Sequence, residues 1–136
     1  MRAVLDVNVL ISALLSPSGA PARILAAWER GAFELVASPA LIAELERTLS
    51  YPKLERLIAR AGAEQFVAWL GAAAEVVPDP SEEPPERSSD PGDDYLIALA
   101  ADQRVLLVSG DQHLLDLADR VPILTPAGFL ELLAAD

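Results

Sequence analysis

Acidic side chains follow two short apolar segments that lie almost a chain length apart. Ala3-Val4-Leu5 leads into Asp6, and the segment 105–110 leads into Asp111. Short, β-branched apolar runs are typical of buried parallel strands, and ligands of open parallel sheets bind just beyond the carboxyl ends of the strands. Two carboxylates placed there could share one cation. The pattern therefore indicates a cation site built on the ends of two strands.

Helix capping is the competing interpretation of both residues, because each stands where a strand gives way to a helix and Asp is a favoured N-cap. A cap does not require a buried strand aimed at it, so we favour a functional role for Asp6. For Asp111, cap and ligand stay equally good interpretations. Asn8 could orient Asp6 or a water, and Ser109 could bond a phosphate; ordinary turn chemistry is the alternative for both.

Three further acids, Asp90, Asp93 and Asp94, surround the start of a predicted helix. Compensation of the helix macrodipole is the simple explanation, since an anion near a helix N-terminus gains roughly 0.3–1 kcal/mol. Three acids exceed what a cap requires, and adjacent like charges repel. We therefore favour a functional role for Asp93, at the helix border, and leave Asp90 and Asp94 open.

Glu44 and Glu46 are candidates on a predicted helix that begins at the cap-plus-proline signal Ser38-Pro39. At about 100° per residue they lie on opposite flanks of its apolar stripe. The stripe consists of Leu41, Ile42, Leu45 and Leu49. Periodicity alone does not choose between the two glutamates, and a solvated position is the default for each.

Convergent carboxylates are unstable without a counter-ion. Two of them about 5 Å apart repel by roughly 3 kcal/mol at an effective dielectric constant near 20, against a domain stability of about 5–15 kcal/mol. Such a cluster needs protonation or a cation, and oxygen ligands suit Mg²⁺ or Mn²⁺. The chain has no cysteine and a single histidine, His113, which argues against a zinc site.

Composition predicts one cytoplasmic domain over residues 1–136. The hydrophobic fraction is 52%, yet no apolar run approaches the roughly 18 residues of a membrane span. The net charge of −11 disfavours tight RNA binding without excluding it, and could equally recruit a basic partner. Acids and five prolines concentrate in a predicted long loop, 78–92. The locally basic positions are Arg47, Lys53, Arg56 and Arg60.

Strands and helices alternate along the chain, which predicts a three-layer α/β/α sandwich around a parallel sheet of four to five strands. The predicted strands are Arg2–Asp6, Phe33–Ala37, Glu75–Val77, Val105–Val108 and Val121–Leu124. The predicted helices are Val7–Leu15, Pro21–Arg30, Pro39–Leu49, Lys53–Arg60, Ala63–Ala73, Asp93–Ala101 and Asp111–Leu117, with a last one after Thr125-Pro126.

Four segments in order resemble the PIN-domain family, particularly the VapC-like toxin components of prokaryotic toxin–antitoxin pairs. These segments are 4–10, 38–45, 90–94 and 107–111, and 18–25 is similar to the same subgroup. The resemblance covers essentially the whole chain. It implies a sheet of strand order 3-2-1-4-5, in which Asp6 and Asp111 would face each other across the topological switch point.

The resemblance also implies the chemistry. Its metal-binding and catalytic acids would be Asp6, Glu44, Asp93 and Asp111, which selects Glu44 over Glu46; Ser109 stands where many members have Thr. The implied activity is a Mg²⁺- or Mn²⁺-dependent endoribonuclease that leaves a 5′-phosphate and a 3′-hydroxyl. The implied partners are RNA, a cognate antitoxin protein and further copies of the chain in a homodimer or larger homo-oligomer.

The basic cluster allows a second interpretation of its own. Arg47, Lys53 and Arg56 are our candidates for contact with the substrate, and a salt-bridged helix surface is the alternative. Two other functions stay open for the whole chain. One is a non-catalytic partner-binding module. The other is an aspartate-dependent phosphatase, which is disfavoured because Asn8 stands where such enzymes carry a second acid and the only lysine is Lys53.

Overall fold

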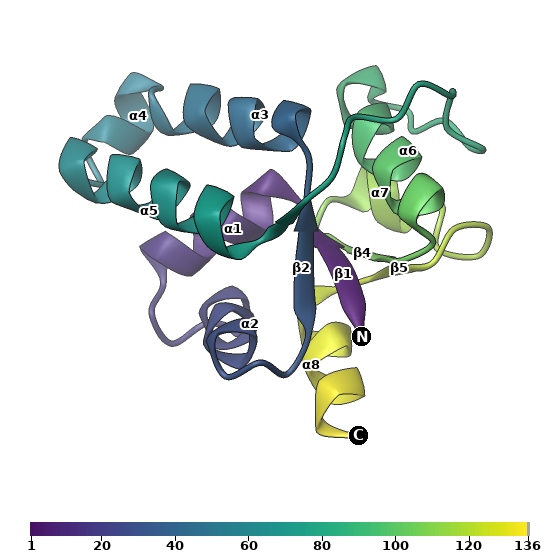
Figure 1. Ribbon diagram of the computed structural model, residues 1–136, viewed down its shortest axis with the longest axis horizontal. Helices are drawn as coiled ribbons and strands as arrows, with labels where there is room; N and C mark the ends of the chain where they lie inside the picture. Colours follow the sequence, from purple (N-terminus) through teal and green to yellow (C-terminus); the bar gives the residue numbers. More distant parts are fainter. Residues whose placement is uncertain (136) are drawn as a thin grey trace.

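A parallel sheet organises residues 1–135, which are the residues that the computed structural model describes (Figure 1). Its strands are β1 (Arg2–Leu5), β2 (Glu34–Ala37), β3 (Glu75–Val76), β4 (Leu106–Val108) and β5 (Ile123–Leu124). They pair in the order β3-β2-β1-β4-β5, each parallel to its neighbour. The predicted strand order is therefore confirmed, and β1 and β4 are direct neighbours in the centre of the sheet.

Helices cover both faces of this sheet. They are α1 (Val7–Leu15), α2 (Ala20–Glu29), α3 (Pro39–Leu49), α4 (Pro52–Glu55), α5 (Arg60–Ala73), α6 (Asp94–Gln103), α7 (Gln112–Leu115) and α8 (Pro126–Ala134), with a 3₁₀ turn η1 (Pro91–Asp93) before α6. α6 packs on β1 and β4, whereas α8 packs on β5 and α2. In Figure 1, α6 and α7 lie above β4 and β5, and α8 lies below them. The layers are those of the predicted α/β/α sandwich.

Two helices begin where the cap-plus-proline signals Ser38-Pro39 and Thr125-Pro126 predicted them to begin. The N–H of Leu41 donates to Oγ of Ser38 (3.3 Å), and the N–H of Gly128 donates to Oγ1 of Thr125 (3.0 Å). Each hydroxyl satisfies an N–H that has no partner within its helix, which is why these two boundaries could be predicted from the sequence.

Other boundaries differ from the prediction. α4 is one turn long, because the chain bends after Glu55 so that Ile58 packs against the core while Leu57 stays exposed. α5 consequently begins at Arg60 rather than Ala63. β5 is shorter than predicted, since Pro122 has no N–H to donate to a neighbouring strand.

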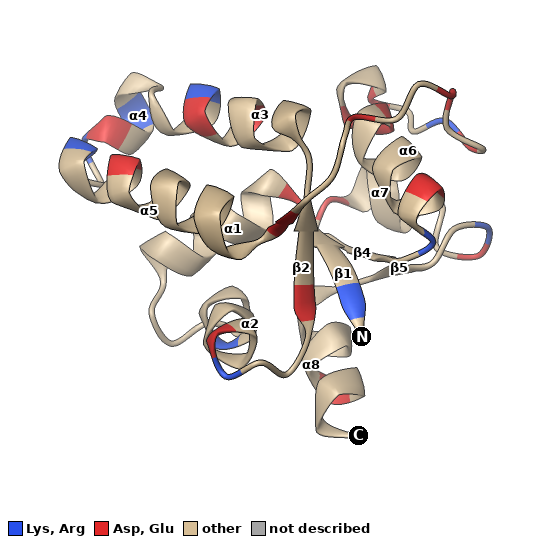
Figure 2. Ribbon diagram, in the orientation of Figure 1, with Lys and Arg blue, Asp and Glu red and all other residues tan. Residues whose placement is uncertain are grey.

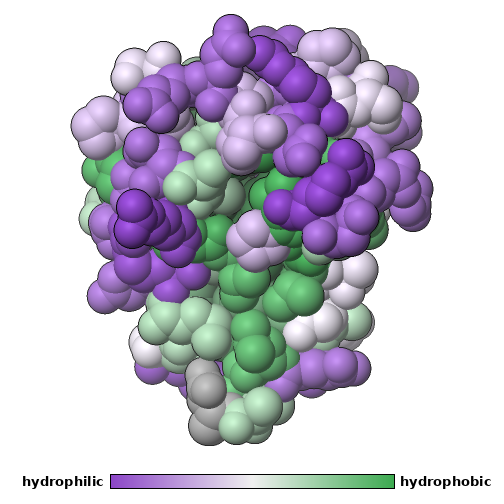
Figure 3. Space-filling view, turned by 90° about the vertical axis from the view of Figure 1, so that its right-hand side faces the viewer, coloured by the Kyte–Doolittle hydropathy of each residue, from purple (hydrophilic) through white to green (hydrophobic). Residues whose placement is uncertain are grey.

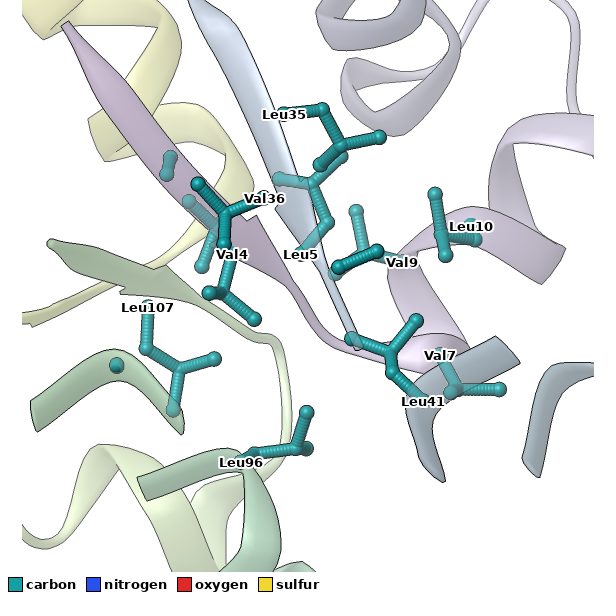
Figure 4. Close-up of a cluster of buried hydrophobic side chains, with 14 of the residues drawn as sticks. Val4, Leu5, Val7, Val9, Leu10, Leu35, Val36, Leu41, Leu96 and Leu107 are labelled. Carbon is teal, nitrogen blue, oxygen red and sulfur yellow. The ribbon is translucent and has the colours of Figure 1, made fainter. Parts of the chain in front are cut away.

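The core is centred on β1, whose Ala3, Val4 and Leu5 are fully buried. Figure 4 shows Val4 and Leu5 near Val36 of β2 and Leu107 of β4. Burial on both faces is what a continuous apolar run predicts for a central parallel strand. The buried core therefore fixes the backbone from which the side chain of Asp6 extends.

Leu107 offers a direct test of this core, because it is fully buried in β4 beside β1. Leu107→Ala is expected to lower the free energy of unfolding by about 2–5 kcal/mol, through lost burial and the cavity left behind. Urea unfolding followed by circular dichroism measures the change. The exposed Leu57 is the matched control: Leu57→Ala should cost less than about 0.5 kcal/mol. Equal losses in the two variants would contradict the assignment of this core.

Length and apolarity exclude a single membrane-spanning helix among residues 1–135. Only α1 and α2 taken together reach the required length and apolarity, and they form a pair bent by 98°.

Candidate active site

The ends of β1 and β4 bring Asp6 and Asp111 together through Ser109. The N–H of Asp6 donates to the carbonyl oxygen of Val108 (2.9 Å), so its backbone continues the pairing of the two strands. Oγ of Ser109 donates to Oδ2 of Asp6 (2.7 Å) and accepts from the N–H of Asp111 (3.0 Å). Ser109 is fully buried. One hydroxyl therefore ties the side chain after β1 to the backbone after β4.

Asp6 and Asp111 both cap a helix, which does not exclude a second role for either side chain. The N–H of Asn8 donates to Oδ1 of Asp6 (3.3 Å), and the N–H of His113 donates to Oδ1 of Asp111 (2.9 Å). Each cap uses a single carboxylate oxygen, so the capping interpretation is correct without accounting for the whole side chain. Asn8 contacts Asp6 through its backbone N–H, which agrees with the alternative of turn chemistry, and its side chain is exposed.

Asp93 comes to this cluster from the start of α6. Its Oδ2 is buried, and no N–H or hydroxyl among residues 1–135 donates to it. Burial raises the pKa of Asp93 to about 7, and the nearby carboxyl group of Asp111, within hydrogen-bonding reach, and the charge of Asp6 act in the same direction. Asp93 and Asp111 are thus close enough to share a proton. The sequence predicted Asp93 as the acid of its segment with a role in the site, and the structure places it beside Asp111.

Burial also raises the pKa of Asp6, and the charge of Asp111 adds to the effect. The hydrogen bonds from Ser109 and from the N–H of Asn8 oppose it, because they favour the ionised form. The cluster therefore carries two carboxyl groups that bind protons more strongly than a solvated aspartate does.

Asp90 and Asp94 make different contacts from Asp93. Asp94 accepts from the N–H of Ser88 (2.9 Å) and pairs with Arg87 (3.3 Å between Oδ2 and Nη1). Asp90 accepts from the N–H of Gly92 (3.0 Å) and caps η1. These two acids fasten the end of the loop 78–92 to α6. The contacts of Asp90 and Asp94 explain why this segment carries more acids than a single helix cap requires.

Glu44 lies on α3 and Tyr95 on α6, and the charge of Glu44 acts on the hydroxyl of Tyr95. The pKa of Tyr95 is raised by burial and by the charges of Asp6, Glu44 and Asp93, which places its hydroxyl in the field of these three acids. The sequence analysis missed Tyr95. The signal that the sequence offers for it is its position two residues after Asp93. Glu46 lies on the opposite flank of α3 and is exposed.

Arg47 holds Glu44 at the border of the site. Its Nε donates to Oε2 of Glu44 (3.0 Å), its Nη2 bonds the same oxygen, and its Nη1 donates to Oη of Tyr51 (3.0 Å). Lys53 and Arg56, the other predicted contacts with substrate, lie on or next to α4, and Nε of Arg56 donates to the carbonyl oxygen of Pro52 (3.3 Å). Figure 2 shows positive charge in this region and negative charge at the ends of the central strands. Of these three cations, Arg47 is the one that pairs with a predicted site acid within residues 1–135.

The acids fit a hard divalent cation by their chemistry. Among residues 1–135 no three Asp, Glu or His side chains are arranged to hold a metal ion as they stand. The donors are nevertheless all oxygen, one buried oxygen of Asp93 is without a partner, and the arginines of this region pair with Glu44 and Asp94 instead. Repelling carboxylates approach one another fully only when a cation offsets their charge. Asp6, Asp93 and Asp111, with Glu44 beside them, are the residues that would hold Mg²⁺ or Mn²⁺.

Metal-free protein is expected to lose stability as the pH rises from about 5 to about 8. Asp93 and Asp6 have raised pKa values in the folded state, so their protonated forms favour folding; this contribution is full below the unfolded value and is lost as the pH rises through the folded value of about 7. Urea midpoints in EDTA across this range measure the loss, and Asp93→Asn should flatten the profile. A wild-type midpoint that increases steadily over the same range would contradict the assignment.

Ser109→Ala is expected to weaken the affinity for Mn²⁺ by about 10- to 100-fold, the usual effect of removing a group that orients a ligand. Oδ2 of Asp6 would lose its donor and the N–H of Asp111 its acceptor. Ser109→Thr keeps the hydroxyl and should restore most of the affinity. Titration with Mn²⁺, followed by calorimetry, compares the three proteins. Equal affinities for Ser109→Ala and Ser109→Thr would show that the hydroxyl does not position the acids.

Comparison with known proteins gives three further findings. A family model described as "PIN domain" matches residues 2–113. The uncharacterized protein MJ1680 of Methanocaldococcus jannaschii is 25% identical over 119 residues, which are 88% of this chain and 76% of that protein. The crystal structure of PAE2754 from Pyrobaculum aerophilum aligns over 100% of this chain and 97% of its own, with a TM-score of 0.67 and 21% identity. The last likeness concerns the fold alone.

Proposed function

This chain belongs to the PIN-domain family, whose members are typically metal-dependent nucleases, and we propose that it is a Mg²⁺- or Mn²⁺-dependent endoribonuclease. One observation carries the proposal. Within residues 1–135, Asp6 and Asp111 meet at the ends of β1 and β4 through Ser109, Asp93 lies close to Asp111, and a buried oxygen of Asp93 has no hydrogen-bond donor. Such a cluster lowers stability unless a proton or a cation offsets its charge, and carboxyl groups with perturbed pKa values are frequent at functional sites.

Each side chain has a definable part in phosphodiester hydrolysis. Asp6, Asp93 and Asp111 would hold the cation, with Glu44 as a further oxygen donor. When bound, the cation would lower the pKa of a water and offset charge that develops on the phosphate. Ser109 keeps Asp6 in one orientation through its hydroxyl. Arg47 borders the acids through Glu44 and is the cation best placed to meet a phosphate of the substrate.

The test is cleavage of a panel of RNAs by the purified protein in Mg²⁺, in Mn²⁺ and in EDTA. Asp6→Asn, purified in parallel and checked for folding, identifies contaminating ribonuclease. Cleavage that requires the cation and is absent from the variant supports the proposal. A cation that neither promotes cleavage of any RNA nor raises the melting temperature would contradict it. The same panel in single-stranded DNA tests the preference for RNA.

The finer biological assignment extends the proposal. We propose that the protein acts on RNA in the cytoplasm as the toxin of a type II toxin–antitoxin pair, that it binds a cognate antitoxin and that it forms a homodimer or larger homo-oligomer. The sequence segments that resemble such toxins support this assignment. Growth arrest on expression, relieved by co-expression of the adjacent small gene, tests it; normal growth at high expression would count against a toxin and leave the nuclease chemistry in place.

No contact among residues 1–135 specifically favours either alternative function, the phosphatase or the non-catalytic partner-binding module. A phosphatase of the aspartyl-phosphate type needs an acid near Asn8 and a lysine at a late strand end. The side chain of Asn8 is exposed, and Lys53 is on α4. A purely partner-binding module would keep the repulsion among three buried or half-buried acids with no function to offset it.

A further inference from the structure

Both carboxylate oxygens of Glu44 face hydrogen-bond donors from the next turn of α3. Nε and Nη2 of Arg47 both bond Oε2, and Oγ1 of Thr48 lies 3.5 Å from Oε1. Thr48 also donates to the carbonyl oxygen of Glu44 (2.8 Å), which keeps its hydroxyl on this side of the helix. The acid that the proposed metal site would take from α3 is therefore engaged by donors of its own helix.

Tyr51 holds the other end of the guanidinium group of Arg47. Nη1 of Arg47 donates to Oη of Tyr51 (3.0 Å), and the guanidinium carbon lies 6.0 Å from the centre of the tyrosine ring. The side chain of Arg47 is 63% exposed and that of Glu44 is 33% exposed. An ion pair this exposed contributes little to stability, so an anion from solution can compete for the arginine. The contact between Arg47 and Glu44 is thus one that a ligand can exchange.

Asp93 and Glu44 differ in what they offer a cation. No N–H or hydroxyl among residues 1–135 donates to the buried Oδ2 of Asp93, so this oxygen can bind a cation as it stands. Oε2 of Glu44 can do so only after Arg47 has left it. This difference agrees with the absence, among residues 1–135, of three acids already arranged to hold a metal ion. Glu44 is therefore the acid whose availability the chain itself controls.

Phosphate is the anion best suited to compete for Arg47. Figure 3 shows hydrophilic residues over the upper half of the molecule, at the height where β1 and β4 end in Figure 1, and a band of hydrophobic residues over its lower half. The end of the sheet that carries the acids is therefore the polar end. Arginine forms paired hydrogen bonds with phosphate as it does with a carboxylate, so a backbone phosphate can take the place of Glu44.

We propose that Arg47 couples the binding of RNA to the completion of the metal site. Without RNA, Arg47 holds Glu44. When a backbone phosphate binds the guanidinium group, Glu44 is released and its Oε2 becomes a further donor to the cation. Arg47 is thus a positioning residue that acts through Glu44. The inference rests on the proposed metal-dependent nuclease function and adds a regulation of the same site.

Calorimetric titration with Mn²⁺ in the absence of RNA tests the hold of Arg47 on Glu44. Arg47→Gln is expected to bind Mn²⁺ about 3- to 5-fold more tightly than the wild type, because no ion pair has to break before Glu44 can bind the cation. Arg56→Gln is the matched control. It removes the same charge from an exposed arginine whose Nε donates to a backbone carbonyl oxygen, and it should change the affinity less than about 2-fold.

A double-mutant cycle separates this effect from simple charge repulsion. In the background of Glu44→Gln, Arg47→Gln should no longer raise the affinity for Mn²⁺, because the acid that Arg47 withholds is absent. Circular dichroism spectra show that all variants fold. An equal gain in both backgrounds would overturn the proposal, since Arg47 would then act only as a positive charge near the cation.

The effect of RNA on the affinity for Mn²⁺ is the second readout. The probe is a short 2′-O-methyl RNA, checked by electrophoresis after each titration, and the same sequence with uncharged methylphosphonate links is its control. The charged probe alone should raise the affinity of the wild type for Mn²⁺, and by reciprocity Mn²⁺ should raise the affinity for the probe by the same factor. In Arg47→Gln this factor should fall by about 3- to 5-fold, the gain that the variant already has without RNA. An undiminished factor in Arg47→Gln, or no effect of the probe on the wild type, would overturn the proposal.

The nuclease proposal and this inference fail in different ways. A wild type that binds no Mn²⁺ contradicts both of them. A wild type that binds Mn²⁺ and cleaves RNA, while Arg47→Gln gains no affinity for the cation, contradicts the inference alone.

Discussion

Asp6→Asn is expected to reduce metal-dependent RNA cleavage by at least about 100-fold while the fold stays intact, the size of effect seen when a group acting directly at a reaction centre is removed. Asn is nearly isosteric with Asp and retains one of its two acceptor oxygens, and Oγ of Ser109 can turn to accept from the amide that replaces the other. What the variant loses is the negative charge. Asp6→Asn therefore tests the charge of this side chain separately from its shape.

The measurement is the initial rate of cleavage in saturating Mn²⁺, with Asp116→Asn as the control. Asp116 is exposed on the end of α7, and its Oδ1 accepts from Nε2 of Gln112 (2.7 Å) outside the site. It should keep the wild-type rate within about 2-fold, as surface substitutions away from a site usually do. If Asp6→Asn cleaved as fast as Asp116→Asn, Asp6 would not be part of the reaction centre.

Asp93→Asn is expected to have two opposite effects. Metal-free protein should become more stable at about pH 8 than the wild type, because Asn cannot carry the buried charge that faces Asp111 and Asp6. The rise in melting temperature that Mn²⁺ gives the wild type should disappear, since the variant lacks a ligand and its orphaned carboxylate oxygen. Gain of stability together with loss of metal response is the signature of a residue retained for binding rather than for folding.

Thermal unfolding with and without Mn²⁺ at about pH 8 measures both effects in one experiment. Asp90→Asn is the matched control from the same segment, because the side chain of Asp90 accepts from the N–H of Gly92 and caps η1. Its stability should stay close to that of the wild type, because Asn caps a helix about as well as Asp, and it should keep the response to Mn²⁺. An Asp93→Asn protein that is both destabilised and responsive to Mn²⁺ would refute the role given to Asp93.

Parts of this architecture could be predicted from the sequence because they depend on local signals. The apolar run before Asp6 predicted a central strand, and Ser38-Pro39 predicted the start of α3. The strand order came from the resemblance of four short segments to a known family, and the sheet confirms it. The convergence of Asp6 and Asp111 follows from that order, since parallel neighbours end at the same edge.

Other features depend on side-chain contacts that no local pattern encodes. Ser109 had two possible partners in the sequence analysis, and neither was the carboxylate of Asp6, which lies 103 residues away. Asp94 could not be separated from Asp93 by sequence, because the N–H of Ser88 that it accepts from belongs to a loop of irregular backbone. Arg47 was a candidate for contact with the substrate, and its ion pair with Glu44 agrees with the alternative of a salt-bridged helix surface.

The attachment of the loop 78–92 has a consequence for how such a protein can change over time. Its last residues are fixed by the contact of Ser88 with Asp94 and by the hydrogen bond between Ser89 and Nδ1 of His113 (2.6 Å). Its first part is fixed where Oδ1 of Asp79 accepts from the N–H of Ala40 (3.0 Å). Insertions or deletions between these two attachments would change the length and surface of the loop without moving Asp6, Asp93 or Asp111. The surface of the loop and the acids of the site can thus evolve independently of one another.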